Sequence, residues 1–117
     1  MNKKYQMYGI KNCDTVRKAI KWMSSREIDF EFNDLKKITP SSGLIVDWLT
    51  DVGKDKLINK RGLTWRKLDT ERKLLPDTNS IVDLIQDHPT LVKRPIIFNG
   101  VHWSVGFNDD EWDKLFL

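Results

Sequence analysis

YQMYGIKNCDTVRKAIKWMSSREIDFEF, residues 5–32, contains the first strand, the first helix and the second strand that we expect in this chain. Residues 5–8 are predicted to be a short strand and residues 9–12 a turn. A helix begins at Cys13, because apolar side chains then recur at the i, i+3, i+4, i+7 spacing of one helix face: Val16, Ala19, Ile20 and Met23. Apolar and polar residues alternate over 28–32, as in a half-buried strand. Together these elements predict a βαβ unit with a right-handed connection.

The middle of the chain, about residues 40–88, is predicted to be helical. Pro40-Ser41-Ser42 is a helix start and Gly53 a plausible stop, and the apolar face between them comprises Leu44, Ile45, Trp48, Leu49 and Val52. We expect a short helix around residues 57–58 and a longer one from residues 78–80 until Pro89. Residues 60–77 show no clear period and stay unassigned.

The last third of the chain is predicted to be a hairpin and a helix. Apolar strands over residues 96–98 and 101–105 flank Asn99-Gly100, a strong hairpin signal. Asn108 with Glu111 three residues later is typical of a helix cap. The order βαβ, helices, ββα predicts an α/β protein of thioredoxin-like fold, with a mixed sheet and an all-helical insertion at about 40–88. We expect one domain over residues 1–117.

Composition narrows the classes of partner. The chain has 39% hydrophobic and 32% charged residues, a net charge of +3 and a pI near 9.0. Basic residues are mixed with acidic ones, as in Lys54-Asp55-Lys56, which indicates solubility rather than nucleic-acid binding. No apolar run is long enough for membrane insertion. With a single cysteine and no signal-peptide pattern at its N-terminus, the chain is expected in the cytoplasm.

Cys13 is the candidate nucleophile. At a helix N-terminus, unpaired N–H groups and the helix dipole stabilise a thiolate, and Lys11 and Arg17 add positive charge nearby, whereas Asp14 opposes it. The alternative is a small structural core residue, as most free cysteines are. The polar neighbours of Cys13 favour the reactive thiol.

The other candidate residues are histidines and arginines. His88 and His102 are interpreted as capping or solvent-facing groups, and two histidines with one cysteine disfavour a zinc site, so no metal is expected. Arg94-Pro95 precedes an apolar strand, and a cis bond there would aim the backbone at a neighbouring site. On the predicted topology Arg94 lies beside Cys13 as a donor for an anionic substrate, although by composition alone it is a surface arginine.

Three stretches resemble one known family. Tyr8-Gly9-Ile10-Lys11-Asn12-Cys13-Asp14-Thr15 resembles the opening of the arsenate reductase (ArsC)-like family, which includes the Spx regulators. Lys60-Arg61-Gly62-Leu63-Thr64-Trp65-Arg66-Lys67-Leu68 and Lys93-Arg94-Pro95-Ile96-Ile97 continue the match in order. The likeness is strongest to the YffB-like branch of this family, and it covers essentially the whole chain.

The resemblance implies a thioredoxin-like fold and a thiol reductase. Cys13 would attack a small oxyanion or disulfide, and glutathione or a glutaredoxin-like thiol would complete the reduction as co-substrate, with no bound cofactor. Arg94 would bind the oxyanion, and Arg61 resembles the family's central-region arginine. The full set expected around the substrate is Arg94, Arg61, Pro95, Asn12, Asp14 and Thr15.

The chain also departs from the family pattern. Gly9 stands where the reductases have a histidine, and no third arginine occurs near Val105-Gly106, so efficient arsenate reduction is not implied. Val16 replaces the second cysteine of the Spx redox switch, which leaves only mixed disulfides with other thiols. Gly53 lies where those regulators contact RNA polymerase. A binding module that contacts RNA polymerase is therefore the alternative to the enzyme.

Overall fold

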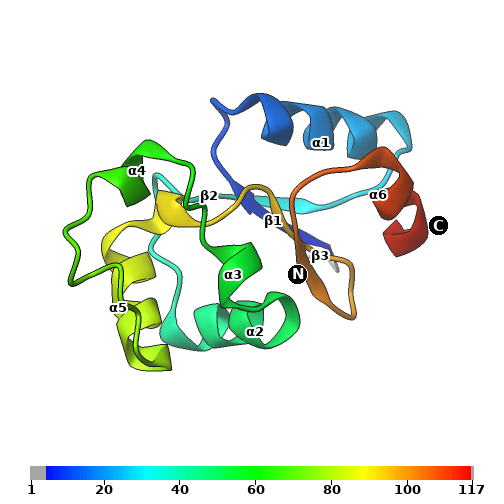
Figure 1. The fold of residues 1–117 in the computed structure, drawn as a ribbon. Helices are drawn as coiled ribbons and strands as arrows, with labels where there is room; N and C mark the ends of the chain where they lie inside the picture. The colour runs from blue at the N-terminus through cyan, green and yellow to red at the C-terminus, as the bar shows by residue number, and fades with distance from the viewer. Residues whose placement is uncertain (1–4, 117) are drawn as a thin grey trace.

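A four-stranded mixed sheet forms the centre of the protein, and a computed structural model describes residues 5–116 (Figure 1). Its strands are β1 (Gln6–Gly9), β2 (Glu31–Asp34), β3 (Ile96–Phe98) and β4 (Trp103–Val105). Their order in the sheet is β2-β1-β3-β4. The β1–β2 pair is parallel, and the β1–β3 and β3–β4 pairs are antiparallel. The predicted mixed sheet is therefore confirmed.

Helices α1 (Asp14–Ser25) and α6 (Asp109–Phe116) cover one face of the sheet (Figure 1). Met7 of β1 and Ile97 of β3 point to this face and are fully buried, because alternate strand residues face opposite sides. The helices bury their apolar stripes against them: Val16, Ala19, Trp22 and Met23 from α1, and Trp112 from α6. Three of the four residues that predicted α1 lie on its buried side, whereas Ile20 is only half-buried and Trp22 is buried in its place.

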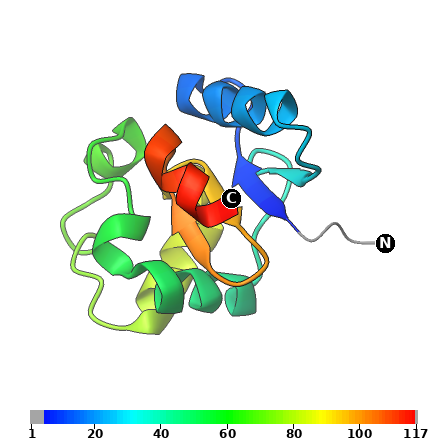
Figure 2. The ribbon, with the colours of Figure 1, turned by 90° about the vertical axis from the view of Figure 1, so that its right-hand side faces the viewer.

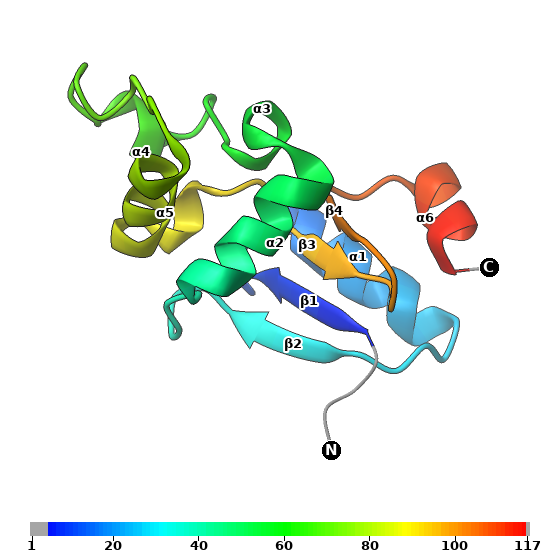
Figure 3. The ribbon, with the colours of Figure 1, turned by 90° about the horizontal axis from the view of Figure 1, so that it is seen from below.

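Helix α2 (Ser42–Val52) covers the opposite face (Figure 3), so that Figure 2 shows α1 on one side of the strands and the green helices on the other. Ser41 caps α2 as its side chain accepts a hydrogen bond from the Leu44 N–H at 3.2 Å. Ile45 and Trp48 of α2 join a second core cluster with Ile96 of β3. This cluster continues into α5 (Thr78–Asp87) through Ile81, Val82, Leu84 and Ile85.

Short elements connect these helices. They are α3 (Lys54–Leu57), α4 (Leu63–Arg66) and the 3-10 helix η1 (Pro89–Leu91). Gly53 separates α2 from α3. Its φ of +87° is a backbone conformation that glycine adopts without steric cost. Periodicity did not reveal α4, because one turn is too short to show a repeat. Within residues 5–116, no helix is long and apolar enough to span a membrane.

Three predicted boundaries are wrong. β1 covers Gln6–Gly9 rather than residues 5–8, so Gly9 ends the strand and does not begin the turn. β2 begins at Glu31 rather than Ile28, because its parallel partner β1 begins only at Gln6, opposite Glu31. β4 begins at Trp103 rather than Val101. Asn99 Oδ1 accepts hydrogen bonds from the N–H groups of Val101 and His102 at 3.0 and 2.8 Å, which holds residues 99–102 as a four-residue loop.

Candidate functional site

Cys13 is the N-cap of α1, with φ −145° and ψ 123°. Its carbonyl accepts the N–H of Arg17 at 2.9 Å, and no side chain caps the helix. The N–H groups of the first turn, on Asp14, Thr15 and Val16, therefore have no intrahelical partner. The half-buried thiol packs against the core clusters of both sheet faces. A thiolate or bound anion here faces the positive end of the helix dipole.

Arg17 holds the two residues on either side of Cys13. Its guanidinium donates one hydrogen bond to Asp14 Oδ1 at 2.7 Å and another to Asn12 Oδ1 at 2.8 Å. Both contacts are at the surface, with 57% of the Arg17 side chain and 88% of the Asp14 side chain exposed. We call Asn12, Asp14 and Arg17 the Arg17 clamp. It offsets the Asp14 charge that opposes a thiolate at Cys13.

The Arg17 clamp limits which groups of Asn12 and Asp14 can bind a substrate. The side-chain oxygens of Asn12 and Asp14 already accept from Arg17, so their backbone groups are what remains for a ligand. Thr15 is exposed, and its hydroxyl makes no hydrogen bond within residues 5–116. The sequence alone indicates Arg17 only as a positive charge near Cys13. Its spacing of three residues from Asp14 on one helix is the signal that could have identified the pair.

The Arg94–Pro95 peptide bond is cis, and it lies at the end of the sheet where β1 leads to Cys13. The antiparallel β1–β3 register pairs Tyr8 with Ile96, so residues before Ile96 lie beside those after Tyr8. The Pro95 carbonyl also accepts the Gly106 N–H at 2.9 Å. The half-buried Arg94 guanidinium makes no hydrogen bond or ion pair with any residue from 5 to 116.

Arg61 lies in the loop after α3. Backbone hydrogen bonds tie this region to residues 91–93: the Asn59 N–H donates to the Leu91 carbonyl at 2.9 Å, and the Lys93 N–H to the Leu57 carbonyl at 2.7 Å. Arg61 is exposed and lines a cavity of about 270 Å³ with Lys93. The lining of that cavity includes neither Cys13 nor Arg94. The backbone thus joins the Arg61 loop to the Arg94 segment without placing the Arg61 side chain at the thiol.

An aromatic cluster lies beneath the end of β1. The Tyr8 ring centroid is 5.3 Å from that of Trp48 and 5.8 Å from that of Trp103. Burial raises the pKa of the Tyr8 phenol, and the nearby Glu31 charge raises it further. Tyr8 therefore stays protonated at neutral pH and cannot serve as a general base.

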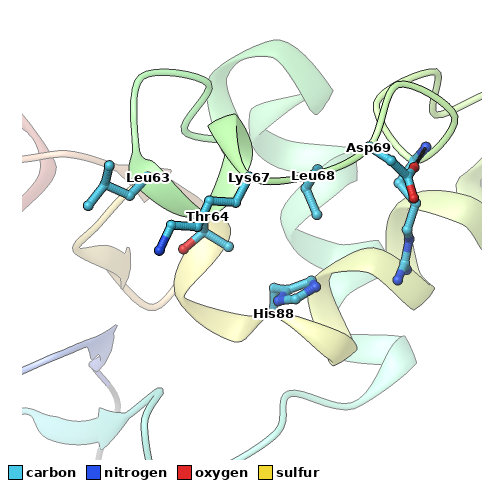
Figure 4. Close-up of a pocket in the computed structure, with 7 residues that line it drawn as sticks. Leu63, Thr64, Lys67, Leu68, Asp69 and His88 are labelled. Carbon is cyan, nitrogen blue, oxygen red and sulfur yellow. Dashed lines mark hydrogen bonds between the residues drawn. The ribbon is translucent and has the colours of Figure 1, made fainter.

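The histidines lie in other parts of the fold. His88 ends α5 and lines a cavity that α4 also borders (Figure 4). His102 is exposed in the β3–β4 loop. Neither arrangement supplies a base to Cys13.

Comparisons with known proteins identify the family of this chain. A model of the ArsC family matches residues 8–115. An uncharacterized protein of Haemophilus influenzae is 38% identical over 110 residues, which cover 94% of this chain and 96% of that protein. The global transcriptional regulator Spx of Streptococcus pyogenes is 31% identical over 102 residues, covering 86% of this chain and 75% of that protein.

A solved structure extends the likeness to three dimensions. The YFFB (PA3664) protein superimposes with a TM-score of 0.91 at 31% identity, over 97% of this chain and 99% of that one. The predicted thioredoxin-like architecture is thereby confirmed, and the motifs around Cys13, Arg61 and Arg94 lie within the matched range. The chain belongs to the ArsC family.

Proposed function

We propose that this protein is a glutathione-linked thiol reductase in which Cys13 is the nucleophile and the substrate is a small oxyanion or a disulfide. The observation that carries the proposal is Cys13 at the N-terminus of α1, where no side chain caps the helix. The free N–H groups of the first turn are oriented to stabilise the thiolate and the negative charge that develops on the substrate. Membership of the ArsC family supports this choice of chemistry.

With a disulfide, the Cys13 thiolate attacks one sulfur and forms a mixed disulfide, and the other sulfur leaves as a thiolate that takes a proton from water. One glutathione then releases the bound half of the substrate and takes its place on Cys13. A second glutathione forms glutathione disulfide and frees the Cys13 thiolate. The substrate gains two electrons and two protons, and the two glutathione molecules lose them.

Arg94 is proposed to bind the anionic part of the substrate. It is half-buried, has no partner within residues 5–116 and precedes Ile96, which pairs with Tyr8 at the end of β1. A planar guanidinium suits carboxylates and oxyanions because it donates two parallel hydrogen bonds. Arg61 would assist only if its exposed side chain turned from its own cavity toward the substrate.

The proposal is tested by NADPH oxidation coupled through glutathione reductase, with arsenate and hydroxyethyl disulfide as substrates. Cys13→Ser should abolish turnover while circular dichroism and thermal unfolding stay close to those of the wild type. Arg94→Ala should raise the KM for arsenate about tenfold, as expected for one lost charge-assisted contact, and should change the KM for the uncharged hydroxyethyl disulfide much less. Arg26→Ala, at the opposite end of α1, is the matched control and should leave turnover unchanged. Full turnover by Cys13→Ser would overturn the assignment.

A regulatory binding module that contacts RNA polymerase is the second candidate. The identity to Spx of Streptococcus pyogenes over most of the chain favours it. The single cysteine opposes an internal disulfide switch, so binding would not depend on one. Retention of a purified polymerase subunit by both the wild type and Cys13→Ser, together with no turnover, would support this candidate over the enzyme.

A further inference from the structure

The positive charge of this chain is concentrated between residues 60 and 74. This segment contains six basic residues and two acidic ones, Asp69 and Glu71, whereas the whole chain has 20 basic and 17 acidic residues. The remainder therefore carries fourteen basic and fifteen acidic residues, and its own balance is slightly negative. The six basic residues are Lys60, Arg61, Arg66, Lys67, Arg72 and Lys73.

Most of this charge has no internal counter-ion. Lys60 lies 3.9 Å from an Asp55 oxygen, and Arg72 donates to Asp87 at 2.9 Å. The four other basic side chains, Arg61, Arg66, Lys67 and Lys73, form no ion pair within residues 5–116. Charge left uncompensated on one segment attracts ligands of opposite sign.

The same segment contains a groove with an apolar lining. This cavity has a volume of about 470 Å³ (Figure 4). On one side of it lie α4 and the residues that follow α4, and on the other side lies the junction of α5 and η1. Leu63 and Leu68 supply its apolar surface, and Lys67 borders it from the side of α4 while His88 borders it from the other side. We call this cavity the α4 groove.

The groove is open to a partner. Leu63, at its edge, is 68% exposed, and Leu74, at the end of the segment, is 70% exposed. The polar atoms of Thr64, Lys67 and His88 make no side-chain hydrogen bond within residues 5–116. A peptide with an apolar side chain between carboxylates would therefore find leucines to pack against and a lysine to pair with.

We propose that the α4 groove docks an acidic peptide segment of a partner protein. An apolar side chain of the peptide packs between Leu63 and Leu68, and its carboxylates face Lys67, the unpaired cation of the lining. The lining favours a peptide over a nucleic acid, because its exposed Leu63 can pack against an apolar side chain and offers nothing to a phosphate backbone. Peptide binding in the α4 groove does not require any reaction at Cys13.

The test is fluorescence anisotropy of the full chain with a short fluorescein-labelled peptide of glutamate interrupted by leucine. A peptide with serine in place of leucine and a labelled oligothymidylate are the comparison probes. We expect the leucine peptide to bind more tightly than both, and its affinity to fall as salt is raised. Lys67→Glu should weaken binding about tenfold, because attraction becomes repulsion. Leu63→Ser should weaken the leucine peptide and leave the serine peptide unchanged.

The matched control is Lys18→Glu, the same charge change on the exposed face of α1. It should bind the peptide as the wild type does. The proposal is overturned if the wild type binds no peptide, if Lys18→Glu weakens binding as much as Lys67→Glu, or if oligothymidylate binds more tightly than the leucine peptide. Unchanged circular dichroism of the variants ensures that a lost affinity reflects the groove and not unfolding.

Discussion

A Cβ atom placed on Gly9 would lie 3.0 Å from Val16 Cγ2 and 3.4 Å from Val16 Cγ1. Gly9 ends β1 and Val16 lies in the first turn of α1, so strand and helix approach closely on either side of the Cys13 turn. These are also the two positions at which the sequence departs from the family pattern, which has a histidine in the reductases and a second cysteine in the Spx regulators. The valine occupies the space that a side chain at position 9 would need, and the two departures form a single packing arrangement.

Gly9→Ala should therefore destabilise the protein. Overpacking a tight contact costs about 1–3 kcal/mol, partly offset by about 0.4–1 kcal/mol from a stiffer unfolded chain. The free energy of unfolding in urea measures the change. Val16→Ala removes the obstructing methyl groups, so Gly9→Ala should cost at least about 0.5 kcal/mol less in that background. Equal costs in both backgrounds would show that the contact relaxes freely.

The Arg17 clamp should act on the reactivity of Cys13 more than on stability. Arg17→Ala removes two exposed hydrogen bonds, so the free energy of unfolding should fall by less than about 1 kcal/mol. The uncompensated Asp14 carboxylate should meanwhile slow the alkylation of Cys13 by iodoacetamide at neutral pH. Asp14→Asn in the Arg17→Ala background should restore the rate. A slow double variant would mean that the clamp acts through backbone position rather than charge.

An element could be predicted from the sequence where the repeat of its apolar residues matches the face that it buries. The spacing of Val16, Ala19 and Met23 predicts α1, because these residues are fully buried. The start of β2 could not be predicted from its own alternation, since the length of its partner strand sets it. Likewise, the Asn99 side chain, rather than strand propensity, sets the start of β4.

The candidate site shows the same division. Cys13 could be placed at a helix start because the apolar face of α1 begins three residues later. The Gly9–Val16 approach could not be predicted, because it depends on how α1 packs across β1. The α4 groove could not be predicted either. Most of its lining lies in residues 60–77, which the sequence left unassigned, and it faces His88, which is distant in the sequence.

Asp77 should make the stability of the protein depend on acid. It caps α5 by accepting hydrogen bonds from the N–H and the hydroxyl of Ser80, both at 2.8 Å. These hydrogen bonds hold the pKa of Asp77 below its usual value of 3.8. Its stabilisation is therefore present above that value and is lost as the pH falls below it.

The contribution of Asp77 can be isolated with two substitutions. Asp77→Asn keeps a cap acceptor without a titrating charge, so its Tm should fall less than that of the wild type between neutral pH and a pH below 3.8. Asp77→Ala should lower Tm at neutral pH as well, because it removes the cap. An identical acid dependence in wild type and Asp77→Asn would contradict the assignment.

Tyr8 should make the protein less stable at high pH, as Asp77 makes it less stable in acid. Burial, and secondarily the Glu31 charge, raise the pKa of its phenol above 10.0, so the folded chain retains a proton that the unfolded chain releases. Proton release from the unfolded state favours unfolding, and the stabilisation present below pH 10.0 is lost as the pH rises above it.

Tyr8→Phe has no phenolic proton, and its free energy of unfolding in urea should fall less steeply above pH 10.0 than that of the wild type. Glu31→Gln should give an intermediate slope, because it removes the smaller of the two causes. Parallel slopes for wild type and Tyr8→Phe would mean that the phenol titrates alike in both states and that its packing on Trp48 does not restrict its ionisation.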